Sequence, residues 1–145
     1  MILRIFFVTL FSFLFSSCEK HYVAVTKVDI NRISLASTFA NTPDPRQLFP
    51  LKGEQLVVEW NLPSAMKGKE LFLDLSLVYR DYSEETLQYD LGSLRGVISY
   101  FLLGENFQER KGVMTYRAEI RTKEGDLVKS WQHKLWITLI KLDED

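Results

Sequence analysis

The chain has 145 residues, a formal net charge of −1, and a composition that is 46% hydrophobic and 26% charged. This length suits one domain, and the balance is typical of a folded chain rather than a disordered one. The 18 basic residues are scattered, so the sequence offers no basic face for nucleic acid. A single cysteine excludes an intramolecular disulfide and a zinc site made of thiolates alone.

Residues 1–17 have the layout of a secretory signal peptide. Arg4 precedes an apolar run from Ile5 to Phe15, and the small residues Ser16 and Ser17 follow. The run is shorter than the roughly 20 residues that a membrane-spanning helix needs. The alternatives are a conventional signal cut after Cys18, an uncleaved anchor, and a cytosolic protein with an apolar start.

The stretch "FSSC", Phe15–Cys18, resembles the lipobox of bacterial lipoproteins, with Phe15 where that family usually has leucine. The resemblance implies that Cys18 carries the lipid and begins the mature chain, with residues 18–24 as a tether. It implies a membrane partner through the lipid anchor. It also favours the outer membrane, facing the periplasm or the surface, because Glu19 stands where an aspartate often retains such proteins at the inner membrane.

Strict alternation of apolar and polar residues predicts three strands in the mature chain. Pro63 ends the first, since proline cannot donate a hydrogen bond to a neighbouring strand. The inward positions are Leu56, Val58, Trp60 and Leu62 in the first strand, Leu71, Leu73, Leu75, Leu77 and Tyr79 in the second, and Met114, Tyr116, Ala118 and Ile120 in the third. In the third strand Thr115, Arg117, Glu119 and Arg121 are expected to face outward.

The flanking segments are less regular. "YVAVTKVDINRISL" predicts one or two edge strands, and the proline-rich "ANTPDPRQLFP" predicts a loop. "KEGD", Lys123–Asp126, is expected to be a hairpin turn. The return strand is expected from Leu127 to about Leu142, with a bulge or a change of sheet near Lys134–Ile137, where the alternation fails.

Residues 84–103 allow two interpretations. Their leucines recur at helical spacing after Ser83, a possible helix cap. Gly92 and Gly96 would each cost about 1 kcal/mol in a helix. We therefore expect two strands with a turn at Gly92–Ser93, with room for a helical turn after Ser83.

Six to eight strands with turns between them predict an all-β fold: a single antiparallel β-sandwich over residues 25–142, allowing one short helix, with an acidic tail at 143–145. "LVVEWNLP", around Trp60, and "YRAEI", around Tyr116, resemble the second and sixth strands of a fibronectin type III or immunoglobulin-like domain. We expect Trp60, Tyr116 and Phe101 to fill the core.

The sequence contains no glycine-rich phosphate loop, no nucleophile elbow and no histidine pair at metal spacing. We therefore predict no catalytic residues, no metal and no cofactor, with His133 as a structural or surface residue and His21 in the tether. Tyr and Arg favour binding surfaces. Around a predicted strand end they give a candidate partner-binding cluster of Tyr79, Arg80, Tyr82 and Tyr89.

The predicted function is that of a non-enzymatic bacterial envelope lipoprotein whose sandwich binds an envelope protein or helps an assembly. The alternative is a membrane-tethered module for carbohydrate or another small ligand. Coplanar exposed aromatic rings or a deep pocket would favour the ligand. A flat apolar patch or an unprotected strand edge would favour the protein partner.

Overall fold

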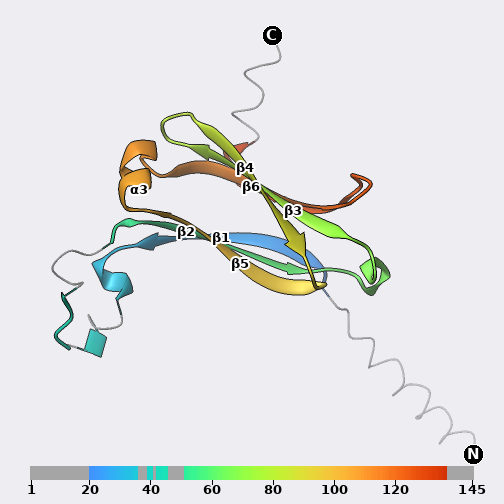
Figure 1. Ribbon diagram of the computed structural model, residues 1–145, viewed down its shortest axis with the longest axis horizontal. Coiled ribbons are helices and arrows are strands. Elements are labelled where there is room, and N and C mark those ends of the chain that lie inside the picture. The colour runs from blue at the N-terminus through green and yellow to red at the C-terminus, as the bar shows by residue number, and fades with distance from the viewer. Residues whose placement is uncertain (1–19, 36–38, 41, 46–50, 137–145) are drawn as a thin grey trace, which may run out of the picture.

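The computed structural model describes residues 20–35, 39–40, 42–45 and 51–136. The described strands form two antiparallel sheets packed face to face (Figure 1). Sheet A has the order β1-β2-β5, formed by Tyr22–Ile30, Gly53–Asn61 and Arg95–Leu103. Sheet B has the order β4-β3-β6-β7, formed by Glu84–Leu91, Leu71–Tyr79, Val113–Thr122 and Leu127–Gln132. Short helices are η2 (Arg32–Ser34), η4 (Ser64–Met66) and α3 (Gly104–Arg110).

This topology confirms the predicted all-β antiparallel sandwich. Strands β1 and β2, β3 and β4, and β6 and β7 pair as sequence neighbours within one sheet. The chain changes sheets between β2 and β3, between β4 and β5, and between β5 and β6. Sheets that exchange strands in this way share one core between their inner faces.

The core consists of the alternate side chains that the sequence pattern marks as apolar. The predicted inward residues of β2 and β3 are all buried, including Trp60 and Tyr79. Val23 and Val25 of β1 and Leu102 of β5 complete the sheet A side. Tyr116 is buried as expected, whereas Phe101 is 51% exposed. Phe101 was wrongly assigned to the core, because Tyr100 and Leu102 take the inward positions of β5 and Phe101 pairs with Gln55 on the outer face.

A β-bulge changes the predicted pattern at the start of β6. Val78 pairs with Thr115 while Tyr79 pairs with Val113, so Met114 is the extra residue. Val113 takes the inward position that the alternation gave to Met114, and Met114 is only half-buried. Thr115 keeps its outward register but is buried, contrary to the expectation of a solvated side chain. One inserted residue shifts the alternation of inward and outward side chains for the residues of the strand that precede it.

Residues 84–103 form the two predicted strands, with the break at residues 92–94. They are not a hairpin, since β4 pairs with β3 and β5 pairs with β2. The strand begins directly at Glu84, so the helical turn allowed after Ser83 does not form. A short helix follows at Gly104–Arg110 instead, and its Phe107 packs against the core.

The ends of the domain differ from the expected boundaries. β1 already begins at Tyr22, so residues 22–24 belong to the sandwich rather than to a tether. The hairpin turn after Thr122 forms as expected, with Gly125 at φ 94°. β7 ends at Gln132 instead of near Leu142, and a turn at 133–135 follows, which accounts for the broken alternation there. Cys18 and the tail at 143–145 lie outside the described residues.

Two side-chain contacts stabilise the two ends of the sandwich, the first within sheet A and the second between the sheets. The indole of Trp60 lies across Gly96 on the neighbouring strand, and its Nε1 donates to the carbonyl of Ser93 at 3.1 Å. At the other end of the sandwich, Lys27 of sheet A forms an ion pair with the buried Glu54 at 2.8 Å. The second oxygen of Glu54 accepts the backbone N–H of Val113, on sheet B, at 2.7 Å. Glu54 thus ties the two sheets.

Candidate interaction surfaces

The predicted cluster of tyrosines does not form one surface. Tyr79 is fully buried and so cannot contact a partner, and Tyr89 is half-buried against the core. Arg80 is exposed in the β3–β4 turn, and Tyr82 is 78% exposed with a left-handed φ of 66°. Only Arg80 and Tyr82 therefore present themselves to solvent. Alternation already placed Tyr79 on the inward face of its strand, and its predicted role in a partner site is wrong.

Tyr79 instead organises a polar cluster between the two sheets. Its hydroxyl donates to Glu85 at 2.5 Å and lies 2.7 Å from the hydroxyl of Tyr100, which belongs to sheet A. Arg110 of α3 donates to Glu85 at 2.9 Å, and its guanidinium lies 4.2 Å from the centre of the Tyr79 ring. Burial, then the hydrogen bond to Glu85, raises the pKa of the Tyr79 phenol far above its ordinary value. The cluster is structural: it fixes α3 against β3–β5.

The outer face of sheet A is a larger exposed surface than Arg80 and Tyr82 provide, and it was not predicted from the sequence. Apolar side chains on this face lie among the uncharged polar residues Thr26, Gln55 and Ser99, and Val97 is 59% exposed. Charges on this face are confined, within the described strands, to Glu59 and Arg95. We define the apolar face by Tyr22, Ala24, Val28, Val57, Val97 and Phe101. The sequence signal for this face was β5, in which apolar residues occupy both the inward and the outward positions.

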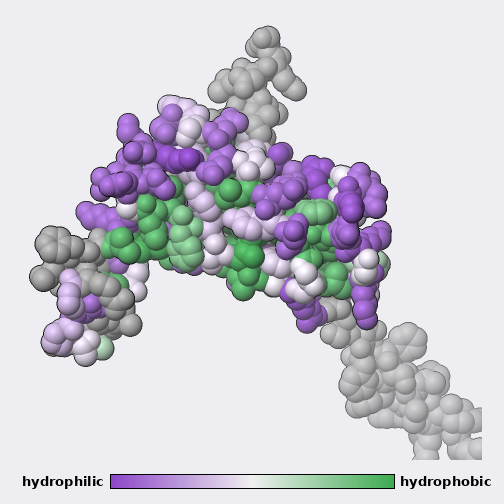
Figure 2. Space-filling view, viewed as in Figure 1, coloured by the Kyte–Doolittle hydropathy of each residue, from purple (hydrophilic) through white to green (hydrophobic). Residues whose placement is uncertain are grey.

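The outer face of sheet B has the opposite character. Asp74 accepts a hydrogen bond from Gln88 at 2.9 Å, and Glu119 pairs with Arg121 at 3.0 Å and with Arg117 at 3.5 Å. These charged and polar side chains pair with one another. Figure 2 shows the contrast, with hydrophobic residues toward the sheet A side and hydrophilic residues along the sheet B side. A sandwich that keeps one outer face polar and the other apolar has one face suited to contact with another molecule.

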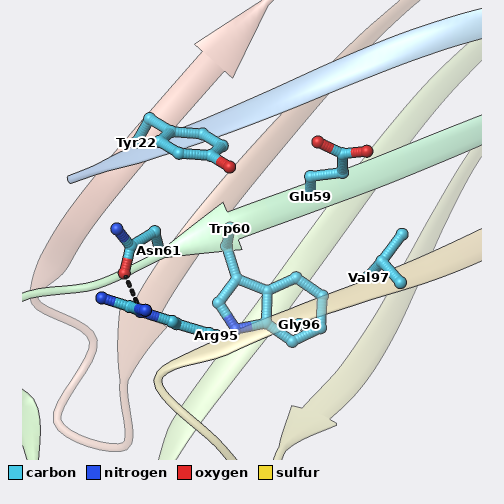
Figure 3. Close-up of a pocket in the computed structure, with 7 residues that line it drawn as sticks. All are labelled: Tyr22, Glu59, Trp60, Asn61, Arg95, Gly96 and Val97. Atoms are coloured by element: carbon cyan, nitrogen blue, oxygen red, sulfur yellow. Dashed lines mark hydrogen bonds between the residues drawn. The ribbon is translucent and has the colours of Figure 1, made fainter. Parts of the chain in front are cut away.

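A shallow hollow of about 360 Å³ lies at one end of the apolar face (Figure 3). Tyr22 and Glu59 line it together with Arg95, whose Nε donates to Asn61 at 2.9 Å. Trp60 also lines the hollow, but it is almost completely buried. One exposed ring beside polar groups could stack on a sugar, although no second coplanar ring accompanies it among the lining residues.

Another hollow, of about 420 Å³, lies near the Lys27–Glu54 pair. It is lined by Arg80, Tyr116 and His133, among others, and the Tyr116 ring stacks on His133 with centroids 5.1 Å apart. Burial, and then the Glu54 carboxylate, raises the pKa of the Tyr116 phenol. His133 therefore has the structural role expected of it, as a ring that covers the core.

Within the described residues, no group of histidine, cysteine or carboxylate side chains could hold a metal ion. Across the same part of the chain, no helix has the length and apolar character to cross a membrane. His21 is half-buried at the start of the described region, beside β1.

No family model, curated protein or solved structure matches the chain.

Proposed function

We propose that this chain is a bacterial envelope lipoprotein whose β-sandwich is a protein-interaction or assembly module. The observation that carries the interaction role is the apolar face of sheet A, opposite a sheet whose outer face is charged and internally paired. Such a patch on an otherwise polar domain is typical of a protein contact. The proposal assigns no catalysis to the domain.

The position of the apolar face beside an open strand edge suits a protein better than a small ligand. Val97 and Phe101 lie on the outer face of β5, which is the outermost described strand on its side of sheet A. An unpaired strand edge can accept an extended segment of a partner through backbone hydrogen bonds. The partner would then cover β5 and the apolar side chains beside it.

Site-specific photocrosslinking in native envelopes tests this role. A photoreactive phenylalanine analogue at Val97 should give a discrete adduct. The same analogue at Gln88, on the outer face of sheet B, should not. A second substitution on the apolar face, Phe101→Asp, should abolish the adduct from position 97. Equal adducts from both positions would contradict the proposal.

The anchor is supported by the signal-like residues 1–17 and by the lipobox resemblance at Cys18. Two or more acyl chains on one residue suffice for stable membrane attachment, whereas one chain binds only marginally. Incorporation of labelled palmitate into the wild-type chain, absent from Cys18→Ser, would support it. A Cys18→Ser chain that still carries lipid would overturn it. Fractionation of the same cells distinguishes the proposed outer-membrane location from the inner membrane.

The second candidate function is carbohydrate or small-ligand binding at the hollow beside Tyr22. The observation in its favour is the exposed phenol next to Glu59 and Arg95, which could stack on and hydrogen-bond a sugar. A glycan array probed with wild type and Tyr22→Ala tests it. Binding that disappears in Tyr22→Ala would favour the ligand role over the protein partner.

A further inference from the structure

We propose that the end of the sandwich at which β1 begins rests on the phospholipid headgroups of the membrane that holds the anchor. We call this the basal end. It comprises the start of β1, the β2–β3 connection at residues 62–70 and the β4–β5 connection at residues 92–94. The inference rests on the lipid anchor of the proposed function and adds the orientation of the domain.

The length of the chain before β1 sets the first constraint. Tyr22 is four residues after Cys18. An extended chain spans at most about 3.5 Å per residue, so Tyr22 stays within about 14 Å of a lipidated cysteine. Tyr22 pairs with Asn61, and Asn61 pairs with Arg95, so one end of every strand of sheet A stays within reach of the membrane surface.

The opposite end of sheet A cannot reach the same surface when the strands stand upright. Each of its strands has nine residues, which corresponds to about 30 Å at roughly 3.3 Å per residue. In Figure 1 the β2–β3 connection and the start of β1 lie together at the right, while α3 lies at the left. A fluorophore attached at one end or the other would therefore report which end of the domain faces the membrane.

Exposed charges of both signs lie at each end of the sandwich. At the basal end Lys20, Lys67 and Lys69 are exposed, as are Glu124 and Asp126 of the adjoining β6–β7 turn, and Glu70 pairs with Lys123 at 2.6 Å. At the far end the exposed groups include the carboxylates Asp29, Asp81, Glu84, Glu105 and Glu109 and the cations Lys52, Arg80 and Lys111. Anionic headgroups attract lysines within a Debye length of the surface, so the contact is assigned to Lys67 and Lys69 themselves and not to a difference in charge between the two ends.

A hollow at the basal end has the chemistry of a headgroup site. Its volume is about 440 Å³, and apolar side chains line it beside two lysines. The lining residues are Met66, Leu71, Leu91 and Leu94, with Lys67 and Lys69. Two lysines can bind the phosphate of a lipid headgroup, and the apolar side chains beside them can contact its glycerol. The hollow therefore lies at the end of the sandwich that the short tether keeps close to the membrane.

The chain allows a direct test, because it has one cysteine and acylation would consume its thiol. A cysteine introduced at Ser64, in the β2–β3 connection, or at Glu105, on α3, is then the only thiol available for a fluorophore. The full-length acylated protein is placed in vesicles of phosphatidylethanolamine and phosphatidylglycerol that contain a headgroup-labelled quencher lipid. We expect most of the fluorescence to be lost at position 64 and little at position 105.

Paired charge reversals test the electrostatic contact. In the Ser64→Cys background, Lys67→Glu with Lys69→Glu should reduce quenching. Lys52→Glu with Arg80→Glu, the same charge change at the far end, should leave it unchanged. Circular dichroism shows that both variants are folded. Equal effects of the two pairs would overturn the contact.

The failures of the two proposals are distinguishable. A chain that carries no acyl group and leaves the vesicles overturns the anchor and the orientation together. A chain that is acylated and retained, but is quenched equally at positions 64 and 105, overturns the orientation alone.

Discussion

The absence of a side chain at position 96 lets the Trp60 indole lie across β5. A Cβ atom placed on Gly96 would stand 2.3 Å from Cζ2 of Trp60, closer than non-bonded carbon atoms pack. We predict that Gly96→Ala lowers the free energy of unfolding by about 1–3 kcal/mol, because overpacking forces the ring or the strand to move. Urea denaturation followed by tryptophan fluorescence measures the change.

Gly92 supplies the matched control, since a Cβ atom there meets nothing within 4 Å. Gly92→Ala should leave the denaturation midpoint close to that of the wild type. If Gly96→Ala behaves in the same way, the Trp60–Gly96 contact is not a close-packed one.

The Tyr79 phenol makes stability depend on alkaline pH. Its pKa in the folded state is raised above the unfolded value of 10.0, chiefly by burial and then by the hydrogen bond to Glu85. The folded chain therefore holds this proton more tightly than the unfolded chain. The contribution is complete below pH 10 and is lost as the pH rises towards the folded pKa.

We therefore predict that Tyr79→Phe flattens the fall in unfolding free energy above pH 10. At neutral pH the variant should be less stable by about 1 kcal/mol, the typical net value of one hydrogen bond. Tyr82→Phe, at an exposed ring, should keep the wild-type slope. Denaturation curves from pH 8 to 11 provide the measurement, and identical slopes for wild type and Tyr79→Phe would refute this account.

At the scale of elements, the ion pair between Lys27 and Glu54 joins β1, β2 and the start of β6. The side chain of Glu54 is 7% exposed and that of Lys27 is 24% exposed. Lys27→Met leaves a buried carboxylate without its cation, so we predict a loss of about 3 kcal/mol. Thermal unfolding checks it. Lys123→Met, which breaks a pair in solvent, should have little effect.

Alternation predicted β2 and β3 residue by residue because both strands bury one face only. It failed at β6, where a bulge changes the parity at Met114. It could not show that β4 and β5 pair with different sheets, because strand partners depend on contacts distant in sequence. The turn after Gln132 was missed for a related reason: Leu135 and Trp136 look like strand residues, and only tertiary packing ends the strand.

At the scale of the whole molecule, the apolar face should be dispensable for folding and required for partner contact. The outward side chains of Val97 and Phe101 leave the core untouched. We predict that Val97→Glu with Phe101→Glu keeps the melting temperature within the small range typical of surface substitutions. The same variant should lose its envelope crosslinks. A large drop in melting temperature would show that this face is part of the fold.

The candidate surface was less predictable than the fold. The tyrosines near residue 80 were chosen by residue type, and type does not distinguish buried Tyr79 from exposed Tyr82. The face that does stand out combines Val28 of β1, Val57 of β2 and Val97 of β5. Such a surface exists only once β5 is placed beside β2, and a linear pattern does not contain that placement.

The separation of β2 from β5 along the chain also has a kinetic consequence. β3 and β4 are joined by the short turn at 80–83, whereas the whole of β3 and β4 lies between β2 and β5. Closing the longer loop costs more chain entropy, so the β3–β4 hairpin should form before sheet A is complete. Leu87→Ala should then slow refolding, while Ile98→Ala should mainly speed unfolding. Until β5 docks, the edge of β2 stays unpaired, and misassembly between nascent chains is most probable in that interval.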